Sequence, residues 1–259
     1  MLFRNRKWLV VLGLVAAAIL LSGCSPSAHQ ATTTADMANG GWWTRNVVYW
    51  FSLTLDKFAE MFDGSYGLSI LMLTIIVRTL ILPLTLKQYK SSKAMQALQP
   101  ELKKIKDKHK DNPQKQQEET MKLFQANQVN PLAGCLPLLV QMPIFIALYN
   151  SIYGNIAIRE HTFLGMQLGT APSQGEWYYY IVPVIAAITT FIQSKMMPQQ
   201  PNNPMQALLL IFPVMIFIMS INFPVALPIY WVFSNIYTIV QNYFLYVRSS
   251  DKGKEAPAK

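Results

Sequence analysis

Long uncharged stretches dominate the second half of the chain. Residues 123–158, 177–194 and 196–247 contain no Asp, Glu, Lys or Arg. An α-helix needs about 20 mostly apolar residues to cross a bilayer, and another apolar stretch, with one charge, precedes these three. We therefore predict an all-α membrane protein whose five transmembrane helices lie at 64–86, 131–153, 177–195, 206–221 and 227–247.

Prolines mark the boundary between the last two predicted helices. Pro224, in Asn222-Phe223-Pro224, and Pro228 interrupt the longest uncharged stretch. Proline removes a backbone donor and clashes with the preceding turn, so we predict a tight turn at 222–226. The fourth helix carries Pro213 and is short for a full crossing, so we expect it to be tilted or shielded by its neighbours.

The segment before the first span predicts an amphipathic helix over 42–62. Apolar residues recur there every three or four positions, at Val47, Phe51, Leu55, Phe58 and Phe62. Trp42, Trp43 and Trp50 suit the membrane–water interface. Two interpretations stay open, a helix lying on the outer membrane surface and a helix packed against its own protein.

The first 23 residues resemble a signal peptide, with three basic residues followed by an apolar run. The ending Leu21-Ser22-Gly23-Cys24 resembles the lipobox of bacterial lipoproteins. We predict that Cys24 is lipidated and that 24–63 is an extracellular, lipid-anchored segment. The alternative is a plain apolar anchor that ends in cysteine. The second cysteine, Cys135, lies in an apolar run, so no disulfide is expected.

A basic insertion at 87–130 separates the first two spans and sets the predicted topology. It contains ten lysines and five acids, and apolar residues follow a helical spacing on either side of Asp111-Asn112-Pro113. We predict a helical hairpin. Lysines favour the cytoplasmic side, so the hairpin, the 196–205 loop and the 248–259 tail are expected inside. The N-terminus and the 154–176 loop are expected outside.

Composition agrees with a membrane protein. Charged residues make up 14% of the chain, hydrophobic residues 52%, and the mean hydropathy is +0.22, whereas about 25% of a soluble domain is charged. So few charges could not cover a water-exposed surface. The net charge of +9 comes largely from the hairpin. A soluble enzyme and a soluble nucleic-acid binder are excluded.

Arg78 is the one charge within the first predicted span. It precedes Lys87 by nine residues, or about 13 Å at ~1.5 Å per residue, so it is expected near mid-membrane. Exposing it to lipid would cost at least about 2.5–3.5 kcal/mol. No predicted span contains an acid that could pair with it. We therefore interpret Arg78 as facing a polar interior where it can attract an anion, and Thr74 as sharing its helical face.

Other predicted spans carry polar residues that could line the same interior. They are Gln141 on the second helix, Thr189 and Gln193 on the third, and Ser234, Asn235, Thr238, Gln241 and Asn242 on the fifth. Each could instead make an ordinary hydrogen bond between helices. A single hydrophilic cavity lined by all these residues is a simpler explanation than a separate hydrogen bond for each.

Enzymatic signals are absent from the sequence. The three histidines are scattered, no HExxH, GxSxG or phosphate-binding loop occurs, and the cysteine count predicts no metal site. The predicted spans contain no Asp or Glu for an ion relay, which argues against a proton- or sodium-coupled transporter. We predict a protein that is not an enzyme and needs no cofactor.

Three motifs resemble the YidC/Oxa/Alb family of membrane protein insertases. The first runs from Leu73 through Arg78 to Leu84, and the second from Asn130 through Gln141 to Tyr149. The third is the stretch from Asn222 to Asn235, in which Val225-Ala226 replaces the family's usual Ala-Gly. The lipobox and the short outer segment resemble the Gram-positive form, which includes a sporulation-associated paralogue.

The resemblance implies a five-helix groove that is open to the cytoplasm and to lipid and closed outside. Its substrate-binding residues would be Arg78, Thr74, Gln141, Gln193, Trp231, Ser234, Asn235, Thr238 and Gln241. Expected clients are nascent single- and double-span membrane proteins, including the ring subunit of ATP synthase. Expected partners are the ribosome, the Sec translocon and membrane lipid. The alternative from another class is a passive channel or pore that uses the same hydrophilic cavity.

Overall fold

The computed structural model describes residues 32–129, 136–196 and 204–247. The N-terminal part comprises α2 (Thr34–Met37), a π-helical turn η1 (Thr44–Val48), α3 (Tyr49–Met61), α4 (Tyr66–Leu80), α5 (Leu82–Ala97), α6 (Gln99–Lys108) and α7 (Pro113–Ala126). The middle part comprises α8 (Leu136–Gly154), α9 (Ile156–Glu160), β1 (Thr162–Phe163), β2 (Met166–Gln167), and the 3-10 turns η3 (Pro172–Gln174) and η4 (Trp177–Tyr180). The C-terminal part comprises α10 (Ile181–Met196), α11 (Pro204–Ser220), α12 (Ala226–Asn242) and the π-helical turn η5 (Tyr243–Val247). The predicted signal peptide, Cys24, Cys135 and the 248–259 tail lie outside the described residues.

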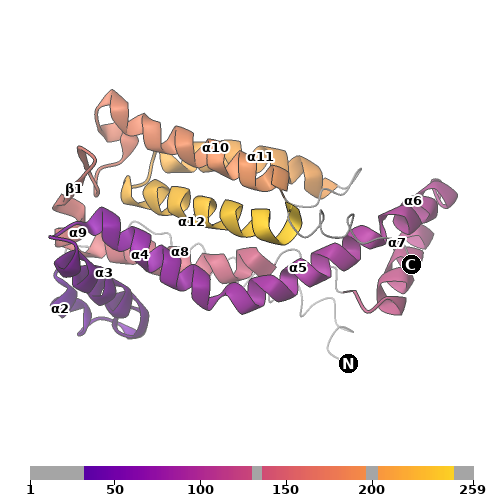
Figure 1. Ribbon diagram of the computed structural model, residues 1–259, viewed down its shortest axis with the longest axis horizontal. Coiled ribbons are helices and arrows are strands. Elements are labelled where there is room, and N and C mark those ends of the chain that lie inside the picture. The colour runs from indigo at the N-terminus through magenta and orange to yellow at the C-terminus, as the bar shows by residue number, and fades with distance from the viewer. Residues whose placement is uncertain (1–31, 130–135, 197–203, 248–259) are drawn as a thin grey trace.

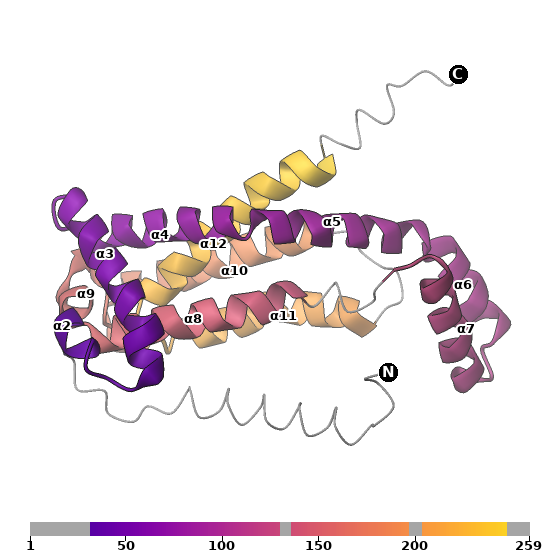
Figure 2. The same cartoon turned by 90° about the horizontal axis from the view of Figure 1, so that it is seen from below.

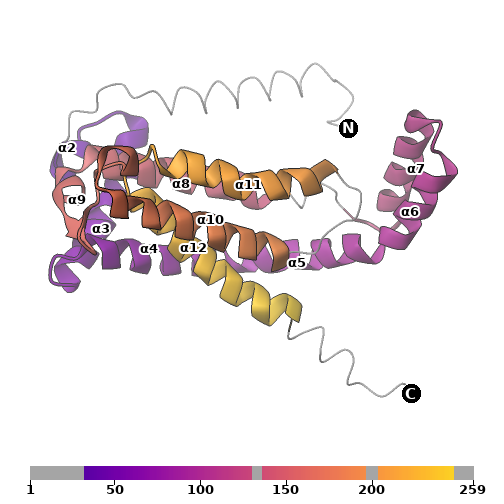
Figure 3. The ribbon, with the colours of Figure 1, turned by 90° about the horizontal axis from the view of Figure 1, so that it is seen from above.

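The long helices α4, α8, α10, α11 and α12 form one bundle (Figure 1). Helix α5 continues from α4 beyond the bundle, and the α6–α7 hairpin stands at its far end (Figure 2). Helices α10 and α11 lie side by side, with α12 against α10 (Figure 3). Among the described helices, none is by itself long and apolar enough to qualify as a membrane span, whereas 44–61 and 66–80 qualify as a pair bent by 120°.

The first predicted span is divided in the structure. Helix α4 ends at Leu80, and α5 begins at Leu82 and continues to Ala97, into the part of the chain assigned to the hairpin. Pro83 lies at the start of α5, where its missing N–H costs nothing. The same logic applies to Pro228, which lies in the first turn of α12 rather than in the preceding turn. The chain turn between α11 and α12 is therefore at 221–225.

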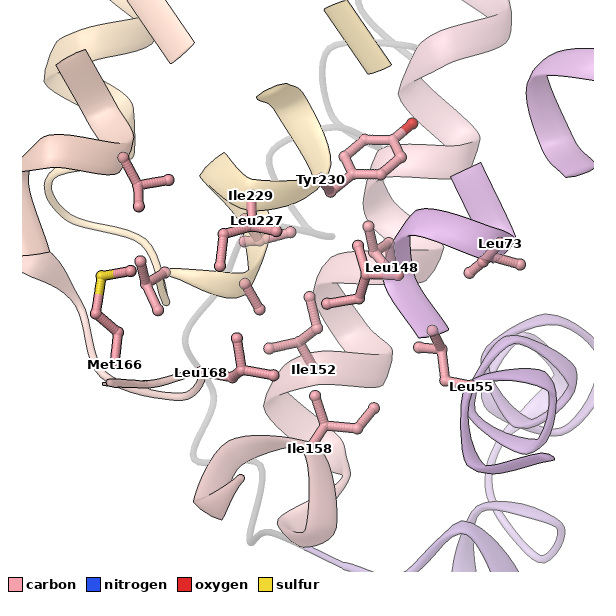
Figure 4. Packing of buried hydrophobic residues seen from close by; sticks show 14 of the residues in the cluster. Leu55, Leu73, Leu148, Ile152, Ile158, Met166, Leu168, Leu227, Ile229 and Tyr230 are labelled. Carbon is pink, nitrogen blue, oxygen red and sulfur yellow. The ribbon is translucent and has the colours of Figure 1, made fainter. Parts of the chain in front are cut away.

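Buried apolar side chains of α3, α4, α8, α9, α12 and the loop after α9 pack together in one cluster (Figure 4). On α8 they form one face, because Phe145, Leu148 and Ile152 are spaced by three and four residues. Leu73 of α4 and Leu227 of α12 pack in the same cluster. This core fixes the relative positions of α4, α8 and α12.

A buried polar cluster joins α2, α3 and α4 to the end of α8. Asn155, 1% exposed between α8 and α9, donates from Nδ2 to Ser52 (2.7 Å), Thr34 (2.9 Å) and Asp56 (3.0 Å). Its Oδ1 accepts from the backbone N–H at the start of α9, and Tyr66 donates to Asp56 (2.8 Å). Helix α3 is thus hydrogen-bonded to its own protein. Of the two interpretations of this helix, the structure agrees with packing against its own protein on the face that carries Ser52 and Asp56. Trp42 and Trp50, by contrast, are exposed.

The 154–176 loop contains a short β-hairpin that the sequence pattern did not predict. Strands β1 and β2 pair antiparallel, with Phe163 opposite Met166. Leu164 and Gly165 between them have φ angles of 53° and 78°, a two-residue turn of the kind that favours glycine. Phe163 packs where any Cβ on Gly67 of α4 would collide with its ring, so the hairpin closes against α4.

The predicted basic hairpin consists of the second half of α5 together with α6 and α7. The side chain of Asn112 caps α7 by accepting from the backbone N–H of Lys115 (3.0 Å), and Pro113 occupies the first helical position. On the exposed face, the ammonium of Lys122 hydrogen-bonds to Glu118, which lowers the pKa of the Glu118 carboxyl and raises that of Lys122. The lysines of this hairpin are exposed.

Candidate functional site

Arg78 lies in the last turn of α4 and reaches across the bundle to α8 and α12. Its Nε donates to Oγ of Ser234 (2.9 Å), and its Nη2 donates to the same oxygen and to Oε1 of Gln141 (3.0 Å). The side chain is half-buried, whereas Ser234 is 2% exposed. Within the described residues the guanidinium forms no salt bridge, so its positive charge is met by neutral oxygens alone.

Gln141 connects Arg78 to Tyr230 on α12. An arginine can only donate, so the carbonyl oxygen of Gln141 must face it and the amide must face away. The amide Nε2 then donates to Oη of Tyr230 (2.7 Å). Tyr230 and Ser234 are four residues apart and therefore share one face of α12. Arg78, Gln141, Ser234 and Tyr230 form a continuous hydrogen-bonded group, which we call the arginine cluster.

Apolar and aromatic side chains cover the arginine cluster on the side toward the C-terminal end of α8. One turn beyond Gln141 on α8 lies Phe145, whose ring packs edge-on against Trp231 (5.5 Å between centroids) and near Phe223 (6.1 Å). Phe223 in turn contacts Tyr149 (5.8 Å). The arginine cluster is thus followed, toward the C-terminal end of α8, by a packed aromatic layer.

The remaining predicted site residues divide into distinct environments. Asn235, 3% exposed, points to α10, where it donates to Thr190 (2.8 Å), Thr189 (3.0 Å) and the carbonyl of Ala186 (3.3 Å). Ser234 and Asn235 are adjacent on α12 and so point about 100° apart. Among the described residues, no hydrogen bond joins the Asn235 group to the arginine cluster. Asn235 is placed to hold α10 against α12.

Thr74 and Thr238 satisfy their hydroxyls within their own helices. Thr74 donates to the carbonyl of Ile70 (2.6 Å) and is 1% exposed, and Thr238 donates to the carbonyl of Ser234 (2.9 Å). Gln193 and Gln241 differ from them. Within the described part of the chain, Oε1 of Gln193 and Nε2 of Gln241 are buried without a hydrogen-bond partner.

Two tyrosines near Arg78 were not assigned to the site from the sequence. Tyr230 is bound through Gln141, and Oη of Tyr237 lies 3.2 Å from Oγ1 of Thr79, the neighbour of Arg78. The sequence held a signal for Tyr230, because it stands one helical turn before Ser234. Tyr237 stands three residues after Ser234 and follows the same logic.

Comparison with known sequences identifies a family and close relatives that this chain resembles. A profile of the family described as "60Kd inner membrane protein" matches residues 57–252. The chain is 44% identical over 252 residues to "Membrane protein insertase MisCA" of Bacillus subtilis, a match covering 95% of this chain and 93% of that protein. It is 45% identical over 241 residues to "Membrane protein insertase YidC 2" of Bacillus anthracis, covering 90% of this chain and 92% of that protein.

The fold also matches a solved structure. The chain superposes with a TM-score of 0.60 and 26% identity on the structure described as "Active YidC insertase crystal structure with the first transmembrane domain resolved". The match covers 79% of this chain and 47% of that chain. The family profile, which matches residues 57–252, spans α4 to α12, the part of the chain that contains the arginine cluster.

Proposed function

The chain belongs to the YidC/Oxa/Alb family of membrane protein insertases, and we propose that it captures hydrophilic segments of nascent membrane proteins at the arginine cluster. The client's apolar segment is then released into lipid. In this mechanism Arg78 attracts an acidic group of the incoming segment, which shortens the hydrophilic path across the bilayer. Partitioning of the apolar segment into lipid supplies the driving force.

The proposal rests on one observation: among the described residues, the positive charge of Arg78 has no acidic partner. A cation inside an apolar helical bundle is normally paired with an acid. Here the described residues offer Arg78 only the neutral oxygens of Ser234 and Gln141. A neutral hydrogen bond compensates less of the desolvation cost than a carboxylate would. The guanidinium is therefore poised to gain by binding an anion that the protein itself lacks.

Exposed apolar faces support the release step. Helix α10 carries one continuous exposed stripe, comprising Ile181, Val184, Ile185, Ile188, Phe191 and Ile192. Helix α12 exposes Ile236 and Val240. Such faces are unfavourable in water and suited to lipid tails or to an apolar client helix. A client segment that slides along the exposed faces of these helices meets an apolar path into lipid.

We propose that the hydrophilic site is a groove open to the cytoplasm and closed outside by the aromatic layer around Phe145 and Trp231. The proposal includes an extracellular N-terminus lipidated at Cys24, a cytoplasmic α6–α7 hairpin and a cytoplasmic C-terminus. Clients would be single- and double-span proteins, including the ring subunit of ATP synthase. They would be delivered by the ribosome and inserted with or without the Sec translocon.

Reconstitution tests this function. Liposomes containing the purified protein and matched empty liposomes are given a short single-span client, and protease protection of the client measures insertion. We expect protected client only where the protein is present. Ion conductance of the same vesicles tests the pore alternative. Conductance without any gain in client protection would overturn the proposal and favour a passive pore.

A further inference from the structure

The guanidinium of Arg78 uses only part of its hydrogen-bonding capacity. It has five N–H donors in one plane. The bonds to Ser234 come from Nε and Nη2, which occupy one edge of the plane, and the bond to Gln141 comes from the second hydrogen of Nη2. Within the described residues Nη1 donates no hydrogen bond. The edge formed by Nη1 and Nη2 is therefore occupied by one neutral oxygen, that of Gln141.

The two partners of Arg78 differ in how firmly they are held. Ser234 is 2% exposed and receives two N–H groups of Arg78 at once. Gln141 is half-buried and receives a single N–H. A carboxylate binds arginine through two parallel hydrogen bonds that are roughly twice as strong as neutral ones. A carboxylate can therefore replace Gln141 more readily than Ser234.

We infer that Gln141 is a displaceable placeholder for the client's carboxylate. This inference rests on the proposed function and specifies which atoms bind the client's carboxylate. The incoming Asp or Glu side chain takes the Nη1–Nη2 edge of Arg78 and displaces Oε1 of Gln141. Ser234 keeps the Nε–Nη2 edge and so fixes the plane of the guanidinium. The amide of Gln141 stays bound to Tyr230 throughout.

The chemistry of the position predicts opposite effects for two substitutions of similar size. Gln141→Glu places a resident carboxylate where Gln141 now meets Nη2 at 3.0 Å, so the edge is permanently filled and a client acid must compete with a charged group. We expect insertion of an acidic client to fall about tenfold. Gln141→Leu removes the placeholder, and insertion of the same client should rise about two- to fivefold, since one neutral hydrogen bond no longer has to be broken.

The test uses purified full-length protein in liposomes and one single-span client in two versions, one with an acidic translocated segment and one with those acids changed to amides. Wild type, Gln141→Glu, Gln141→Leu and Arg78→Ala are compared by protease protection. Gln117→Glu on the exposed face of α7 is the matched control for an added negative charge, and it should insert both clients as wild type does. Gln141→Glu should impair the neutral client less than the acidic one, and purification of each variant as a single species of wild-type size controls for folding.

The outcomes separate this inference from the proposed function. If wild type inserts neither client, or Arg78→Ala impairs both clients equally, the electrostatic function itself fails. If Arg78→Ala selectively impairs the acidic client but Gln141→Glu inserts it as well as wild type does, the placeholder inference is wrong. It is also wrong if Gln141→Leu lowers acidic-client insertion as much as Gln141→Glu, because Gln141 would then be needed only for packing or for orienting Arg78.

Discussion

Replacing Arg78 by Lys and by Ala separates the charge of this residue from its shape. Lysine keeps a positive charge but loses the planar fork that reaches Ser234 and Gln141 together. Alanine removes the charge and leaves both oxygens without their donor. If attraction of an acid is the role of Arg78, Arg78→Lys should retain much of the activity, whereas Arg78→Ala should lose insertion of clients with acidic outer segments.

The expected size of the loss follows from the contacts. A hydrogen bond to a charged group contributes about 1.5–3 kcal/mol. At about 1.4 kcal/mol per factor of ten, the loss of one client contact corresponds to a decrease of about 10- to 150-fold. The full Coulomb attraction between two unit charges at 4 Å and an effective dielectric constant near 20 is about 4 kcal/mol. We use the range of about 1.5–3 kcal/mol rather than the Coulomb value, because Arg78 is half-buried and its charge is partly screened.

The assay compares initial rates of insertion for one client in matched acidic and neutralised versions. The neutralised client offers no anion, so Arg78→Ala should reduce its rate far less than that of the acidic client. Purification of each variant as a single species of wild-type size controls for folding. If Arg78→Ala reduces both rates equally while the protein stays folded, the electrostatic reasoning is refuted, and Arg78 acts instead by maintaining the shape or hydration of the site.

Three further predictions test the topology, the anchor and the polar cluster around Asn155. Cysteines introduced at Gln193 and Thr238 in a background lacking Cys135 should react with a polar thiol reagent added from the cytoplasmic side only, and equal labelling from both sides would contradict a groove closed outside. Replacing Cys24 by Ala should abolish lipidation, as measured by the mass of the mature protein, with a mild loss of activity; a wild-type protein without lipid would contradict the lipobox assignment. Asn155→Ala should lower the free energy of unfolding by about 3 kcal/mol, because it removes bonds to Ser52, Thr34 and Asp56 and one helix cap, and an unchanged thermal unfolding midpoint in detergent would contradict it.

The helices could be predicted from the sequence because the apolar content and charge of a segment are local properties. The uncharged stretches indicated α8, α10, α11 and α12. The end of α8, the start of α10, the end of α11 and the start of α12 lie within four residues of the predicted positions, whereas α12 ends at Asn242, five residues before the predicted end, and the π-helical turn η5 continues to Val247. The break at Ile81 between α4 and α5 was missed, since nothing in the apolar pattern there changes. Arg78 could also be singled out, because a lone charge in an apolar helix is visible without any partner.

The partners of Arg78 were decided only by the tertiary structure. Ser234 follows it by 156 residues and Gln141 by 63, and polarity alone could not tell which of many polar side chains would meet it. Ser234 and Asn235 show this most clearly, because two adjacent polar residues on α12 turn to different helices. The cluster around Asn155 likewise joins four segments that are distant in sequence. The sequence by itself determined where the long apolar segments lie and where the lone cation lies along them. The packing of α4, α8 and α12 determined what that cation binds, because a hydrogen bond depends on positions in space that no single segment encodes.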